Sequence, residues 1–159
     1  MFKVNDFIVY KRDVCKIKEI KEKLFNNLDY LVLEPIIDRS LTIQIPVDNN
    51  KIRKIITKKE AEDLIERIPN IGILEKEDRL LESEYKNLLQ DEEIDSLVTI
   101  IKTTYLRNEI KRNNNKKIGE KDEAYFNLAE KYLYTEIAVA LDMPKEKVKD
   151  YIISKIENS

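Results

Sequence analysis

Two short runs of charged residues have the composition of possible binding sites. Residues 91–95 hold four carboxylates, the groups that bind divalent cations. The run lacks the alternating oxygen ligands and the glycine turn of a calcium loop, and the helix dipole favours acidic residues at a helix start. We therefore interpret residues 91–95 as a helix start. Residues 111–117 place four basic side chains around three asparagines, a patch suited to contacts with phosphates or acidic proteins.

The composition argues against most catalytic chemistry. The 159 residues include no His, one Cys and two Gly. Without imidazole there is no Ser-His or Cys-His relay, and one thiol cannot build a zinc cluster. Two glycines also exclude the glycine-rich loops that bind nucleotide phosphates. We expect a protein that is not an enzyme, with no cofactor, no metal and no small-molecule substrate.

The first third of the chain has the pattern of short strands. The stretch 41–46 alternates strictly and places Leu41, Ile43 and Ile45 on one face. Asn26-Asn27 and residues 48–50 are typical turn sequences. The expected strands cover 7–10, 14–24 (with a bulge), 30–34, 41–46 and 52–56. Their short connections predict an antiparallel sheet rolled into a small barrel.

The remaining residues have the pattern of helices. Thr57 and Glu60 are spaced as a capping box, so a helix should begin there and run to about residue 68. Pro69 and Gly72 interrupt the chain before the next helix. Further helices are expected over 78–89, from 91 to the asparagines at 113–115, over 120–141 and over 144–156. In the third helix the expected buried stripe is Ile94, Leu97, Ile101 and Tyr105. The expected fold class is α+β, with a sheet domain over 1–56 and a bundle of about five helices over 57–159.

Charge and hydropathy limit the compartment and the partners that we expect for this protein. No stretch approaches the ~20 consecutive apolar residues of a membrane span, the N-terminal sequence lacks the features of a signal peptide, and the single Cys fits a reducing compartment. We expect a cytoplasmic protein with no membrane partner. Residues 1–68 carry a net charge of +2 and residues 69–159 a net charge of −4. A nucleic-acid-binding domain is usually basic, and the helical part is not.

Several segments resemble one family in the same order along the chain. They are 2–10 (FKVNDFIVY), 30–33 (YLVL), 41–49 (LTIQIPVDN), Tyr85-Lys86, Leu128-Ala129 and 136–141 (EIAVAL). Together they resemble the CarD/CdnL family of bacterial transcription regulators. The resemblance implies a Tudor-like or SH3-like barrel that binds the β subunit of RNA polymerase. It also implies a helical domain that contacts promoter DNA at the upstream edge of the melted region and stabilises the open complex.

The resemblance also assigns roles to five residues. Lys23 and Gln44 correspond to positions that contact the polymerase, and Gln44 stands where the family carries a basic residue. Leu81 occupies the position of a Trp that wedges against the opened duplex; the alternative is ordinary packing of a helix. Lys86 and Arg107 are the expected phosphate contacts, with solvated surface charges as the alternative.

Two other functions remain open. Residues 136–148 are similar to a helix-turn-helix unit, with Asp142 at the turn. The helix that follows offers Lys145, Lys147 and Lys149, which suit phosphates better than base edges. A sequence-specific repressor is therefore one alternative. The other is a protein adaptor that docks on RNA polymerase without touching DNA.

Overall fold

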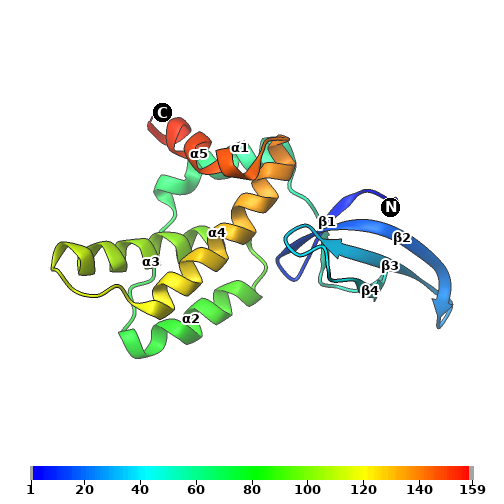
Figure 1. The fold of residues 1–159 in the computed structure, drawn as a ribbon, viewed down its shortest axis with the longest axis horizontal. Helices are drawn as coiled ribbons and strands as arrows, with labels where there is room; N and C mark the ends of the chain where they lie inside the picture. Colours follow the sequence, from blue (N-terminus) through cyan, green and yellow to red (C-terminus); the bar gives the residue numbers. More distant parts are fainter. Residues whose placement is uncertain (1, 158–159) are drawn as a thin grey trace. The chain divides into compact units, whose positions relative to one another are not determined.

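The computed structural model describes residues 2–157 and divides the chain into two compact units, Met1–Ile56 and Thr57–Ser159. The first unit holds a five-stranded antiparallel sheet and the second holds five α-helices (Figure 1). The α+β class, with the sheet before the helices, is confirmed.

The sheet is built from five consecutive strands. They are β1 (Phe7–Tyr10), β2 (Asp13–Phe25), β3 (Leu28–Pro35), β4 (Ile43–Pro46) and β5 (Ile52–Lys54). Their order across the sheet is β4-β3-β2-β1-β5, and every neighbouring pair is antiparallel. β2 and β3 form the longest hairpin (Figure 1). Because no ladder joins β4 to β5 within the described strands, the sheet is open and has two edges. The antiparallel sheet is confirmed, and its predicted closure into a barrel is not.

One face of the sheet carries the core of this unit. The buried members of its apolar cluster are Ile8, Cys15, Ile17, Leu31, Leu33 and Ile45. Val9 and Val14, the neighbours of Ile8 and Cys15 in β1 and β2, point to the opposite face and are buried as well. Leu41 was expected on the same face as Ile45 and is instead 51% exposed. The physical reason is a turn in which the Leu41 N–H donates to the Asp38 carbonyl at 3.2 Å, so that β4 begins two residues later.

The helical unit begins as the sequence predicts. The Thr57 hydroxyl accepts from the Glu60 N–H at 3.0 Å, and the Glu60 carboxylate accepts from the Thr57 N–H at 2.9 Å. This confirms the capping box. The helices are α1 (Lys58–Arg67), α2 (Asp78–Gln90), α3 (Ile94–Asn113), α4 (Glu120–Leu141) and α5 (Val148–Glu157), with short 3₁₀ turns at Ile68–Asn70 and Lys145–Lys147.

α3 and α4 are the longest helices and pack along each other (Figure 1). Their shared core includes the fully buried Ile100 and Ile137. Tyr105 was expected in the core and is 52% exposed. The rest of the predicted stripe is confirmed, since Leu97 is buried and Ile94 and Ile101 pack against the core. In the next two turns the buried positions of α3 are Thr104 and Asn108.

Candidate functional site

The β2–β3 hairpin positions the two residues expected to contact the polymerase. Its turn is Asn26-Asn27, and both residues have positive φ, 52° and 62°. Asparagine tolerates this geometry, and two such residues in a row form the tight turn whose twist matches that of the strands. Phe25 and Leu28 face each other directly across the turn.

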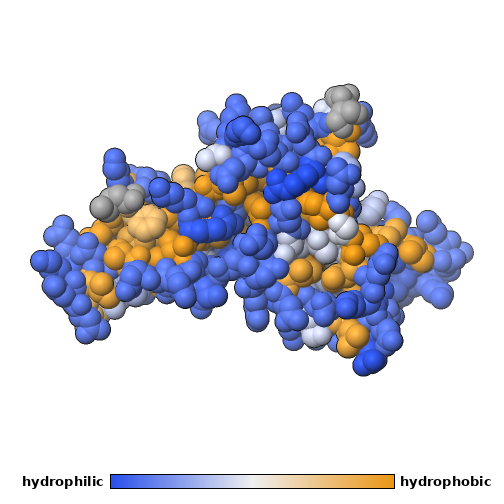
Figure 2. All heavy atoms as spheres, turned by 180° about the vertical axis from the view of Figure 1, so that it is seen from behind, coloured by the Kyte–Doolittle hydropathy of each residue, from blue (hydrophilic) through white to orange (hydrophobic). Residues whose placement is uncertain are grey.

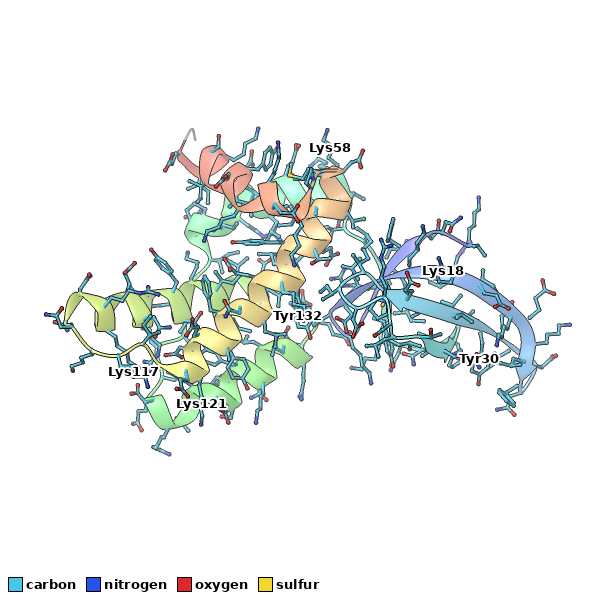
Figure 3. The ribbon with its side chains drawn as sticks, viewed as in Figure 1. Lys18, Tyr30, Lys58, Lys117, Lys121 and Tyr132 are labelled. Atoms are coloured by element: carbon cyan, nitrogen blue, oxygen red, sulfur yellow. The ribbon has the colours of Figure 1, made fainter. Side chains whose placement is uncertain are left out.

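The hairpin then becomes irregular at Lys23. A regular ladder counted back from the Phe25–Leu28 pair would place Lys23 opposite Tyr30. The observed partner of Tyr30 is Lys21. Lys23 has a φ of 46°, and its N–H donates to the Asp29 carboxylate at 3.0 Å, so a side chain replaces the missing ladder partner. Figure 3 shows Tyr30 on β3 close to this turn.

The irregularity brings Lys21, not Lys23, to Gln44. Gln44 is exposed on β4 opposite Val32, and its side-chain oxygen accepts from Lys21 Nζ at 3.2 Å. Lys23 remains exposed near the turn. Sequence reasoning missed the role of Lys21. The contact of Lys21 with Gln44 follows from the positive φ of Lys23, and hydrophobic periodicity gives no sign of a positive φ inside a strand.

The backbone of Gln44 faces the outer edge of the sheet. The Val47 N–H donates to the Asp29 carbonyl at 2.9 Å, which fixes the phase of the β3–β4 ladder. Since hydrogen-bonded pairs alternate along an antiparallel ladder, Ile45 and Ile43 bond to β3 and Gln44 points its N–H and C=O away from it. Pro46 also faces outward, at an edge position where its missing N–H costs nothing. β4 is therefore an edge with backbone groups free to pair with another strand.

In the helical unit, Leu81 is part of the core. Its side chain is 4% exposed and packs in the cluster that includes Tyr85 and Ala129. A residue buried in this way has no surface to insert at a base step. Ordinary helix packing, the alternative considered for Leu81, is what the structure shows.

Arg107 is held by two carboxylates. Its Nε donates to Asp122 at 2.9 Å and its terminal NH1 donates to Asp78 at 3.0 Å. The Tyr85 hydroxyl donates to the other oxygen of Asp122 at 2.9 Å. Burial, followed by this hydrogen bond, raises the pKa of Tyr85 well above its ordinary value. Arg107 therefore links α2, α3 and α4, and its guanidinium is not free to bind a phosphate in this conformation.

Lys86 lies at the surface with a nearby carboxylate. Its side chain is 60% exposed, and Nζ lies 3.6 Å from Glu82 Oε1. The second oxygen of Glu82 lies 3.3 Å from Nζ of Lys121, whose hydrogen bond is the main cause of a lowered Glu82 pKa. Lys86 is thus accessible, and Glu82 shares its one negative charge between Lys86 and Lys121.

Arg107, Glu82 and Lys121 border a cleft of about 580 Å³ in the helical unit, and Lys86 is not among the residues that line it. The cleft lies between the first turns of α2, the last turns of α3 and the loop that enters α4. Lys117 and Lys121 lie at the α4 end (Figure 3). Lys117 is 3.8 Å from Glu120. Basic and acidic side chains alternate around this cleft, so it does not form the continuous positive surface that nucleic-acid binding favours.

The region similar to a helix-turn-helix has a left-handed turn. Asp142 ends α4 with φ 53° and ψ 53°, the conformation usually assigned to glycine at that position. α5 follows, and its exposed residues include Lys149 and Asp150. Lys149 Nζ lies 4.0 Å from Glu130. The helix carries charges of both signs, which does not favour a recognition helix lying along a phosphate backbone.

The acidic run at 91–95 serves the fold. Asp91 accepts from the Glu93 N–H and, at 2.6 Å, from the Ser96 hydroxyl. Asp95 forms a two-bond pair with Arg67, with the shorter distance 2.6 Å. Across residues 2–157, no group of three or more acidic or thiol side chains is arranged to hold a metal ion. Nor does any helix within that range have the length and apolar character needed to cross a bilayer.

No model of a known protein family matches the chain, and no curated protein matches it either. The strongest candidate site is therefore defined by geometry alone: the β4 edge with Gln44 at its centre and Lys21 beside it.

Proposed function

We propose that this protein is a CarD-like transcription regulator that binds the β subunit of RNA polymerase through the β4 edge of its sheet unit. The partner would add an extended segment to β4, because main-chain hydrogen bonds to an exposed edge are a recurrent mode of protein recognition. The helical unit would then affect the stability of the open promoter complex.

The observation that carries the proposal is the outward-facing backbone of Gln44 on an uncharged edge strand. Residues 41–47 contain no charged side chain in a chain that is 38% charged. Edge strands are usually protected by charges, bulges, prolines or short length. β4 is short and ends in Pro46, but it carries no charge, and its outward backbone groups at Gln44 can bind another strand. Lys21, hydrogen-bonded to Gln44, supplies the positive charge that the resemblance expects near this position.

The family resemblance supports the same assignment. The segments that carry it include 41–49, which contain β4. A Tudor-like barrel is the form that the resemblance implies for this unit; the observed sheet has five antiparallel strands, as such a barrel does, but is not closed. The partner and the process remain proposals that rest on the resemblance together with the open edge.

Binding to purified RNA polymerase β subunit tests the proposal. Lys21→Glu should weaken binding by about tenfold or more, because it reverses the charge beside Gln44. Lys23→Glu should weaken it less, since Lys23 is displaced from Gln44. Lys86→Glu, a matched charge reversal on the helical unit, should leave it unchanged. Equal binding by the Lys21 and Lys86 variants would contradict the assignment of the edge.

A second function is favoured by the state of the expected DNA contacts. Leu81 is buried and Arg107 is bound by Asp78 and Asp122, so Lys86 alone of the three is exposed. This favours an adaptor that docks on the polymerase without binding DNA. Open-complex lifetimes measured with wild-type protein and with Lys86→Glu separate the two: a regulator loses its effect in the variant, and an adaptor shows no effect in either.

A further inference from the structure

The sequence of the β4 edge is symmetric about Gln44. Apolar residues occupy the positions one and three residues away on both sides: Ile43 with Ile45, and Leu41 with Val47. Thr42 and Pro46, both small and uncharged, occupy the positions between. An interface between two identical chains related by a two-fold axis requires this property, because residue 44+n of one copy then meets residue 44−n of the other.

The direction of the backbone groups fits the same axis. Gln44 points its N–H and C=O to the outer edge. Two copies of β4 placed antiparallel with their Gln44 residues opposite would exchange two hydrogen bonds at that pair. The outward carbonyl of Pro46 would accept from the N–H of Thr42 of the second copy. Pro46 therefore does not block this register.

The side chains also fit. In this register Ile43 and Ile45 of the two copies become direct neighbours on the core face, in the closer type of antiparallel pair. Ile43 is only partly buried in the single chain, and Leu41 is 51% exposed. Pairing would cover both. Apolar side chains of the sheet unit reach a surface that is otherwise mostly hydrophilic (Figure 2).

The charges near the axis come from β2, not from β4. Residues 41–47 carry no charge, so β4 itself brings no like charges together. The Lys21 ammonium bonded to Gln44 lies near the axis in each copy, and the repulsion between the two weakens the dimer. The uncharged β4 contrasts with β5, the other edge, which carries the basic residues Arg53 and Lys54 within three residues. Edge strands that avoid self-pairing usually carry such basic residues.

We propose that the protein self-associates through β4, forming a continuous antiparallel sheet across a two-fold axis at Gln44. The contact is short, so the dimer is weak and reversible. Where the proposed function holds, on which this consequence rests, self-association covers the same edge that receives the polymerase. The dimer would then be unable to bind the polymerase, and a polymerase strand that pairs with β4 would have to replace the second copy.

The test is the mass of the full chain measured by sedimentation over a wide concentration range. Wild-type protein should shift toward dimer as its concentration rises. Gln44→Lys and Gln44→Glu should each remain monomeric, because like charges then meet at the axis. An equimolar mixture of the two variants should dimerise again, since the introduced ammonium of one copy would face the introduced carboxylate of the other. Lys54→Glu, on the opposite edge, should behave as wild type.

Three results would overturn the proposal: wild-type protein that stays monomeric at millimolar concentration, single Gln44 variants that associate like wild type, or a mixture that stays monomeric while wild type dimerises. None of these measurements involves RNA polymerase. Failure of self-association therefore leaves the proposed function untouched, and failure of polymerase binding leaves the dimer untouched.

Discussion

Two residues that were expected to bind DNA have structural roles in this protein. Leu81 and Arg107 were both expected to contact DNA, and both are engaged inside the helical unit. For Leu81 the sequence had indicated both possibilities, since an apolar residue at helical spacing can be a wedge but is more often a core position. Only the packing of α2 distinguishes them.

Leu81→Ala should therefore destabilise the fold by about 2–5 kcal/mol, the usual cost of truncating a buried leucine. Chemical denaturation measures this change directly. Leu80→Ala, at a less buried neighbouring position on α2, is the control and should cost less. A Leu81 variant with wild-type stability would contradict the core assignment.

Cys15 gives a prediction about pH. Its thiol is buried, and burial, with a smaller contribution from Asp13, raises its pKa from 9.0 to about 12. The folded state therefore holds this proton more tightly than the unfolded state. The contribution to stability is complete below about pH 9 and is lost as the pH rises from there toward about 12.

Two measurements check this. Iodoacetamide should leave native protein unmodified at about pH 8 and label it quickly in denaturant, because the thiolate is the reactive form. The decrease in unfolding free energy above pH 9 should be smaller in Cys15→Ala than in wild type. Rapid labelling of the native protein would show that the thiol is accessible.

At the scale of helices and strands, the turn and cap residues gave the most accurate predictions of where these elements begin and end. The capping box at Thr57 and Glu60, the Asn26-Asn27 turn and the bounds of α4 follow the sequence pattern closely, because each depends on local chemistry. The predicted bulge in the strand over 14–24 is also confirmed by the register shifts of β2 against β3. Its position at Lys23 was not predicted, because it depends on a hydrogen bond to the Asp29 side chain. The exposure of Tyr105 was not predicted either, because it depends on how α3 packs against α4.

Thr57→Ala should reduce stability by about 0.5–2 kcal/mol, because it removes the acceptor for the Glu60 N–H at the start of α1. Lys59→Ala lies in the same helical turn and loses only an exposed pair with Asp63, so its effect should be smaller. Thermal or urea unfolding of the two variants gives the comparison. Equal effects would mean that the cap does not stabilise α1.

At the scale of the whole molecule, two units with different surfaces suggest two different tasks. The sheet unit offers an uncharged open edge, and the helical unit offers a mixed-charge cleft whose strongest ion pairs are internal. The sequence indicated the boundary at 56–57 and the order of the units. It did not indicate that the sheet stays open with β4 and β5 at its two edges, because strand order depends on long-range pairing.

The measurement that tests the central claim most directly is amide hydrogen exchange at Gln44, at a protein concentration low enough to keep the chain monomeric. In the free chain this N–H points away from β3 and should exchange quickly, unlike its ladder-bonded neighbours Ile43 and Ile45. On addition of RNA polymerase β subunit it should become protected. Polymerase binding that leaves the Gln44 amide exchanging as fast as before would contradict the claim that β4 is the docking edge.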